Sequence, residues 1–174
     1  NRRDNRCLLG TIKLTYMSIS DEIAQMVKDG RLYSHHPLMP PATGVSPRQM
    51  YLSEEIHSLI RGGWDSVELE ERCGYLRADL DRFAQGGLIP VAKRPLSGGK
   101  HSFMRQLFRW RDEVWEIRSR DPKPAIRVLG RFAGTDVFIA LNWYYRTGLG
   151  GPNSREWRDA IVGCKTEWRK IFPA

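Results

Sequence analysis

The run AIRVLGRFAGTDVFIALNWY at positions 125–144 decides the fold of this chain. Apolar side chains recur at alternate positions on both sides of Gly134-Thr135, which is typical of two half-buried strands joined by a tight turn. The run VWEIRS at positions 114–119 alternates in the same way, and a proline-rich turn at 121–124 follows it. Connections this short join antiparallel neighbours, so the three segments predict a β-meander.

Working outward from this region, we expect four strands followed by a helix. The strands are expected at Phe103–Arg109, Val114–Ser119, Ala125–Phe132 and Asp136–Tyr144. The helix follows Pro152-Asn153-Ser154, because apolar residues then recur every three or four positions, at Trp157, Ile161, Cys164, Trp168 and Ile171.

Three helices are expected upstream. The first is capped by Ser20, the second runs from Ser46-Pro47 to Gly62-Gly63, and the third begins near Ser66 and ends at Gly86-Gly87. The sequence therefore predicts an α+β fold, in which N-terminal helices precede a four-stranded antiparallel meander and a C-terminal helix. We expect residues 1–65 to form an N-terminal helical extension and residues 66–174 to form the α+β domain.

The composition favours a folded, water-soluble protein. Hydrophobic residues make up 41% of the 174 positions, enough for a core, and no apolar run approaches the ~18 residues that a membrane helix needs. The three cysteines, Cys7, Cys73 and Cys164, form no CxxC pair, and their odd number argues against a disulfide framework. We expect a cytoplasmic protein with no membrane partner.

The net positive charge comes entirely from the second half of the chain. Residues 1–87 hold 11 Lys/Arg and 12 Asp/Glu, a net charge of −1, whereas residues 88–174 hold 17 and 8, a net charge of +9. Arginine outnumbers lysine by 12 to 5 in that second half. Because a planar guanidinium binds phosphate in a bidentate manner, this distribution predicts a polyanionic partner, RNA above all.

Strand alternation then predicts which side chains share a face. Trp115 and Ile117 are expected to pack on the helix at about Ser66–Gln85, and the apolar set of the last strand to be Val137, Ile139, Leu141 and Trp143. The opposite face should gather a polar surface, formed by Glu116, Arg118, Arg127, Arg131, Asn142 and Tyr144. Such a face could bind RNA, or it could be the ordinary solvated side of a sheet. For Glu116, a structural ion pair with the neighbouring arginines is favoured over a role as general base.

Three runs carry a family resemblance: VWEIR at 114–118, AIRVL at 125–129 and VFIAL at 137–141. Together with the linker at 88–99 and the helix after Pro152, they resemble the RelE/HigB toxin family over roughly residues 67–171. This chain departs from the family pattern at Ile126, where an aromatic residue is usual, and at Tyr145-Arg146, where a lysine pair is usual. No strand is apparent directly before the helix that begins near Ser66, and the chain is longer than a typical toxin.

The resemblance implies an mRNA endoribonuclease that acts at the ribosome without a metal or cofactor and is neutralised by an acidic antitoxin protein. By position, the catalytic residues would be Arg118, Arg127, Tyr144, Tyr145 and Arg146. The residues that we expect to bind RNA around them are Arg105, Arg109, Arg131, Asn142, Lys165 and Arg169. Two alternatives remain open: a non-catalytic nucleic-acid-binding protein, and a phage-derived interaction module whose basic face meets an acidic protein.

Overall fold

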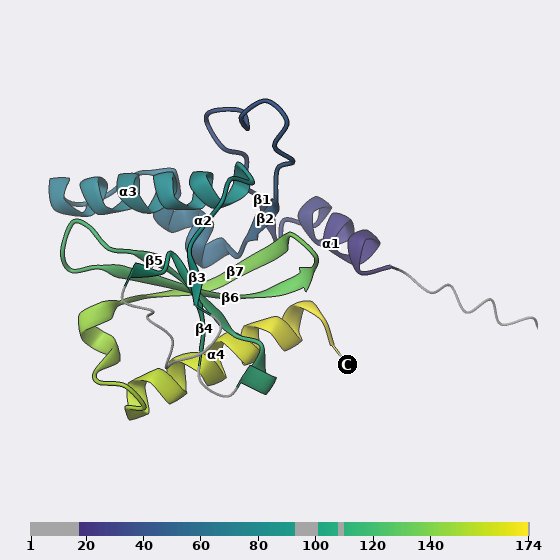
Figure 1. The fold of residues 1–174 in the computed structure, drawn as a ribbon. Coiled ribbons are helices and arrows are strands. Elements are labelled where there is room, and N and C mark those ends of the chain that lie inside the picture. Colours follow the sequence, from purple (N-terminus) through teal and green to yellow (C-terminus); the bar gives the residue numbers. More distant parts are fainter. Residues whose placement is uncertain (1–17, 93–100, 108–109, 174) are drawn as a thin grey trace, which may run out of the picture.

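The computed structural model describes residues 18–92, 101–107 and 110–173, and these residues form one sheet with helices on both faces (Figure 1). The sheet has seven strands in the order β1-β2-β7-β6-β5-β4-β3. The strands are β1 (Tyr33–Ser34), β2 (Gln49–Leu52), β3 (Val91–Ala92), β4 (Met104–Gln106), β5 (Trp115–Ser119), β6 (Ile126–Gly134) and β7 (Val137–Tyr145).

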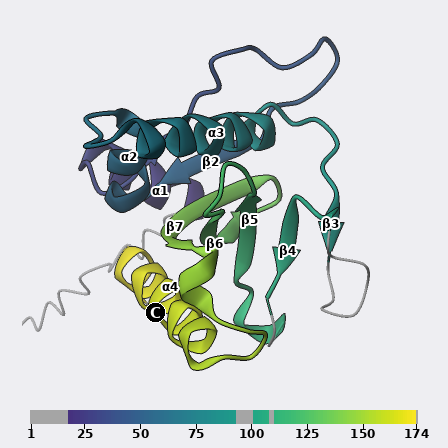
Figure 2. The ribbon, with the colours of Figure 1, turned by 90° about the vertical axis from the view of Figure 1, so that its left-hand side faces the viewer.

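The helices form two layers around the sheet. The helices α2 (Glu54–Arg61) and α3 (Val67–Ala84) cover one face, and α4 (Arg155–Ile171) covers the other (Figure 2). The helix α1 (Ile19–Lys28) packs beside the α4 layer through Ile23 and Met26. Two short 3-10 helices, η2 (Trp110–Asp112) and η3 (Arg146–Leu149), flank the strands that lead to α4.

The prediction of a four-stranded antiparallel meander is wrong, although the α+β class stands. The sheet is mixed, because β2 pairs in parallel with β7 and β3 pairs in parallel with β4, whereas the remaining pairs are antiparallel. Through β2, residues before position 65 share a core with residues after it: Met50 and Leu52 pack with Phe83 and Phe138. The proposed extension at 1–65 therefore contributes two strands to the same sheet, as far as it is described.

The helix expected from Ser46 to Gly62 is wrong in its first part. Residues 49–52 form β2 instead, with Met50 and Leu52 buried and Gln49 exposed, and the helix α2 begins only after Ser53. The Ser53 hydroxyl caps α2 by accepting from the Ile56 amide at 3.4 Å and donates to the Leu141 carbonyl of β7 at 2.6 Å. One side chain thus ends the strand, starts the helix and ties both to β7.

Each face of the sheet has its own apolar core. Ile117 is fully buried against α3, with Leu76, Leu80 and Phe83, and Trp115 packs on the same cluster, so the expected orientation of these two residues is confirmed. On the other face, Leu129 and Ile139 pack against α4. Helices therefore pack on both sides of the sheet, α2 and α3 on one side and α4 on the other, over β6 and β7.

A β-bulge in β7 corrects the predicted apolar set of that strand. Leu129 lies opposite Asn142 and Gly130 opposite Ala140, so Leu141 is the extra residue. The alternation shifts there: Leu141 packs toward α4, while Trp143 packs on the α2 and α3 face. The prediction that Leu141 and Trp143 share a face is therefore wrong, because strict alternation cannot continue through a bulge.

The bulge depends on a glycine at its partner position, which gives a stability prediction. A Cβ on Gly130 would contact the Ile139 carbonyl oxygen and lie 2.6 Å from the Phe138 ring. We expect Gly130→Ala to lower the free energy of unfolding by about 1–3 kcal/mol or more, measured by urea denaturation, because the core is overpacked. Gly74→Ala is the matched control: this exposed position in α3 has open space, so the same change should stabilise the helix by about 0.5–1 kcal/mol. Equal effects at the two sites would contradict this account.

Candidate anion-binding site

One buried carboxylate organises the basic side chains of the sheet. Glu116 of β5 has no exposed surface, and three guanidiniums surround it. The Arg105 Nε atom lies 2.9 Å from Glu116 Oε1, Arg118 Nε lies 3.4 Å from the same oxygen, and Arg127 Nε lies 3.4 Å from Oε2. The predicted structural ion pair at Glu116 is therefore confirmed, with Arg105 as an additional member.

Strand pairing brings these residues together. Arg105 of β4 is the direct cross-strand partner of Glu116, and Arg118 of β5 is the partner of Arg127 in β6. Cross-strand partners share a face, and Glu116 and Arg118 are two positions apart, so all four side chains lie on the face toward α4. Of the expected polar surface, Glu116, Arg118 and Arg127 lie together, but Glu116 and Arg127 are buried, at 0% and 6% exposed.

The guanidiniums are held by backbone and hydroxyl groups as well as by charge. Arg127 Nη1 donates to the carbonyl oxygens of Ser119 and Ile126, at 3.3 and 2.9 Å. Arg118 Nη1 donates to the Ser102 hydroxyl at 3.1 Å, and Arg120 Nη2 donates to the Ser102 carbonyl at 2.8 Å. The cationic groups are thus fixed in place before any ligand arrives.

The site carries more positive than negative charge. The pKa of Arg127 is lowered to about 10, mainly by burial and also by the charges of Arg118, Arg146 and Arg120, while Glu116 opposes the shift. Burial also lowers the pKa of Arg118, again against the attraction of Glu116. One carboxylate therefore does not balance the surrounding cations, and an anion bound here would stabilise their charged forms. We refer to Glu116 with Arg105, Arg118 and Arg127, and with Arg120 and Arg146 beside them, as the arginine cluster.

Of the five residues expected to be catalytic, the three arginines come together and the two tyrosines do not join them. Tyr144 is the cross-strand partner of Arg127, but its hydroxyl lies under α4, 3.3 Å from where a Cβ of Gly163 would stand. Burial raises the pKa of Tyr144, which keeps the hydroxyl protonated. Tyr145 packs on the opposite face, edge-to-face with Trp143 at 5.1 Å between ring centroids.

The six residues expected to bind RNA are dispersed. Arg105 belongs to the arginine cluster, whereas Arg109 lies outside the described residues. Arg131 stacks its guanidinium 4.6 Å from the centre of the Trp168 ring, and it pairs with Glu113 at 2.7 Å. These contacts give Arg131 a structural role that fixes α4 on the sheet.

Of the other three members of that set, Asn142 lies on β7, and Lys165 and Arg169 lie on α4. Asn142 donates to Glu55 of α2 at 3.1 Å. Lys165 of α4 forms an ion pair with Asp112 at 2.6 Å. Arg169 is exposed in the last turn of α4. Of these three residues, Lys165 lines the pocket described next.

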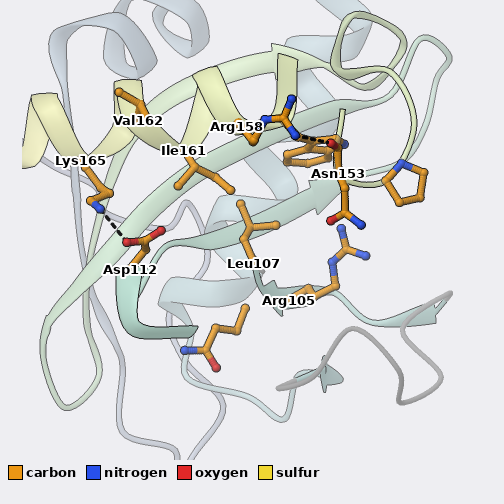
Figure 3. A pocket seen from close by; sticks show the side chains of 11 residues that line it. Arg105, Leu107, Asp112, Asn153, Arg158, Ile161, Val162 and Lys165 are labelled. Atoms are coloured by element: carbon orange, nitrogen blue, oxygen red, sulfur yellow. Dashed lines mark hydrogen bonds and ion pairs between the residues drawn. The ribbon is translucent and has the colours of Figure 1, made fainter. Parts of the chain in front are cut away.

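A pocket of about 370 Å³ opens between β4 and the first half of α4, beside the arginine cluster (Figure 3). Sequence reasoning missed it, because its lining comes from segments about fifty positions apart. The sequence signal that could have indicated this pocket is the run from Asn153 to Arg158, where an amide, a Trp and an Arg stand together at the start of a predicted helix. Its lining residues are Arg105, Gln106, Leu107, Asp112, Pro152, Asn153, Trp157, Arg158, Ile161, Val162 and Lys165.

The described residues give no sign of a metal centre or a membrane segment. They contain no group of three or more His, Cys, Asp or Glu side chains that could hold a metal ion. None of their helices is long and apolar enough to cross a membrane. Comparison with known proteins gave no match: no family model, curated protein or solved structure is similar enough to this chain to assign a family.

The buried position of Glu116 gives a second stability prediction. We expect Glu116→Gln to lower the free energy of unfolding by about 3–5 kcal/mol, because it leaves buried guanidiniums without their counter-charge. Glu113→Gln is the matched control: its pair with Arg131 is shorter, at 2.7 Å, but the Glu113 side chain is 68% exposed, so the loss should be at most about 1 kcal/mol. Chemical denaturation of both variants measures the difference. Similar losses of unfolding free energy in the two variants would show that Glu116 does not stabilise the buried arginines.

Proposed function

We propose that this protein binds single-stranded RNA through phosphate contacts at the arginine cluster. The observation that carries the proposal is the excess of guanidiniums over carboxylates: Arg105, Arg118 and Arg127 share the one carboxylate of Glu116. Desolvated cations of this kind attract an anion more strongly than solvated surface cations do, because less water screens them. The exposed edge of Arg105, with 29% of its side chain accessible, offers a point of contact.

RNA is favoured over a small anion by the surroundings of the cluster. Arg120 and Arg146 are half-buried beside it, so several phosphates in a row could be contacted rather than one. The net charge of +9 on residues 88–174 extends the positive potential beyond the cluster and would steer a long polyanion toward it. An acidic protein, such as the antitoxin that the family resemblance implies, would compete for the same guanidiniums.

Cleavage of messenger RNA at the ribosome is the second candidate function. It is favoured by the convergence of Arg118, Arg127 and Arg146, the arginines that the RelE/HigB resemblance marks as catalytic. The family pattern includes a strand before the helices, which was not apparent in the sequence, and β2 lies before α2 and α3. The positions of Tyr144 and Tyr145 favour binding over cleavage, so catalysis would rest on the arginines and on the RNA itself.

The binding proposal predicts a defined salt dependence. With about three phosphates contacted, the logarithm of the affinity for a labelled RNA oligomer should fall with the logarithm of the salt concentration with a slope of about −2. Arg146→Gln should weaken binding and reduce the slope by about 0.7, because one contact is lost. Arg155→Gln is the control: this side chain is exposed on α4 and pairs with Asp159, so neither affinity nor slope should change. An affinity that does not change with salt concentration would contradict the proposal.

The cleavage proposal predicts growth arrest and cut messages when the protein is expressed in a bacterium. The 2′-hydroxyl of the RNA would attack phosphorus and displace the 5′-oxygen, giving a 2′,3′-cyclic phosphate and a 5′-hydroxyl end, while guanidiniums stabilise the developing charge. Arg146→Ala should reduce the cleavage rate by about 10²–10³, and EDTA should have no effect. Arg127→Ala is unsuitable as a test, because this buried residue also supports the fold. Intact messages and unaffected growth would contradict the cleavage proposal and leave RNA binding as the proposed function.

A further inference from the structure

The pocket under α4 and the arginine cluster are parts of one continuous site. Arg105 belongs to both: its Nε atom contacts Glu116 at 2.9 Å, and the same residue lines the pocket. A second link runs through the loop before α4. Arg146 of the cluster donates to the Gly150 carbonyl at 2.7 Å, and Pro152 and Asn153 of that loop line the pocket.

The pocket has two chemically different ends. Figure 3 shows Arg105, Asn153 and Arg158 gathered at one end, where Arg158 donates to the Asn153 carbonyl at 3.1 Å. At the other end Lys165 and Asp112 neutralise each other in an ion pair of 2.6 Å. A ligand would therefore place its negative charge near Arg105 and its uncharged part farther along the pocket.

The walls between these ends are suited to a flat, mostly apolar group. Leu107, Ile161 and Val162 supply aliphatic surface, and Trp157 and Arg158 supply groups that can stack on a ring. The amide side chain of Asn153 offers donors and an acceptor, as the edge of a nucleobase requires. The volume, about 370 Å³, lies at the lower end of the range for ligand pockets and fits one ring system, not a long chain.

We propose that this pocket holds the base of one RNA nucleotide while the adjoining phosphate contacts Arg105. The inference rests on the proposed RNA binding and adds to it. The arginine cluster binds the phosphate backbone of the RNA, and the pocket binds one of its bases. An aromatic base fits the apolar walls, the stacking groups and the Asn153 amide together, and its phosphate fits the cationic end. An acidic peptide would use the cationic end, but its Asp and Glu side chains carry no ring to fill the apolar walls.

The experiment compares two RNA-like ligands that differ only in their bases. Affinities of the full chain for a hexameric oligoadenylate and for the abasic ribose-phosphate hexamer are measured by competition against a labelled oligomer. The bases should improve the affinity by about tenfold or more, the usual effect of stacking one base. Arg158→Ala and Asn153→Gly should bring this ratio toward one. Glycine is tolerated at position 153, since Asn153 has a φ of 63°.

The control variant is Arg155→Ala, which removes the same charge from α4 at a position outside the pocket and should leave the ratio unchanged. A wild-type ratio near one, with tight binding of both hexamers, would overturn the base pocket and leave RNA binding by the arginine cluster intact. Binding of neither hexamer would overturn both proposals. If an acidic peptide bound instead, with an affinity that Arg158→Ala and Asn153→Gly reduced while the ratio stayed at one, the occupant would be a protein and the inference would be wrong.

Discussion

The structure depends on one carboxylate placed where water does not reach. Burying an ionised group costs several kcal/mol unless partners of opposite charge compensate it. Glu116 meets that requirement with arginines from three adjacent strands, β4, β5 and β6. The ionic contacts therefore join the strands on the α4 face, where Leu129 of β6 and the residues under α4 supply the apolar contacts. Removing any one member changes the charge balance of all the others.

The same arrangement that stabilises the sheet also prepares it to bind an anion. Guanidiniums that are already desolvated and held by carbonyl oxygens lose little freedom when a ligand arrives. Glu116 sets the strength of this site in two opposing ways: it positions the arginines, and it competes with the ligand for their charge. A bound phosphate must therefore improve on a carboxylate that is present permanently, which favours a partner with several phosphates in a row over a single ion.

Local patterns predicted the central strands and α4, and nonlocal contacts account for the errors. Alternation in 114–144 correctly placed Arg118 and Arg127 on one face of the sheet and turned Ile117 toward α3. The strand β2 was mistaken for helix because Leu52, Ile56 and Ile60 are four positions apart, as on one face of a helix, and the strand that β2 pairs with is far along the chain. The strands β1 and β3 have only two residues each, too few for any periodicity. Glu116 is buried among guanidiniums from β4, β5 and β6, and strand alternation alone does not predict how these long side chains pack over it.

The parallel pairing of β2 with β7 has a consequence for how the protein is made. Met50 pairs with Phe138, 88 positions later in the chain. At typical synthesis rates, β2 leaves the ribosome roughly 4–18 s before its partner strand exists. During that interval the apolar side chains of β2, together with the inner faces of α2 and α3, have no sheet to cover, and loop closure over so many residues is slow. The nascent chain thus has a period in which a chaperone, or a second copy of itself, can reach a surface that the finished protein hides.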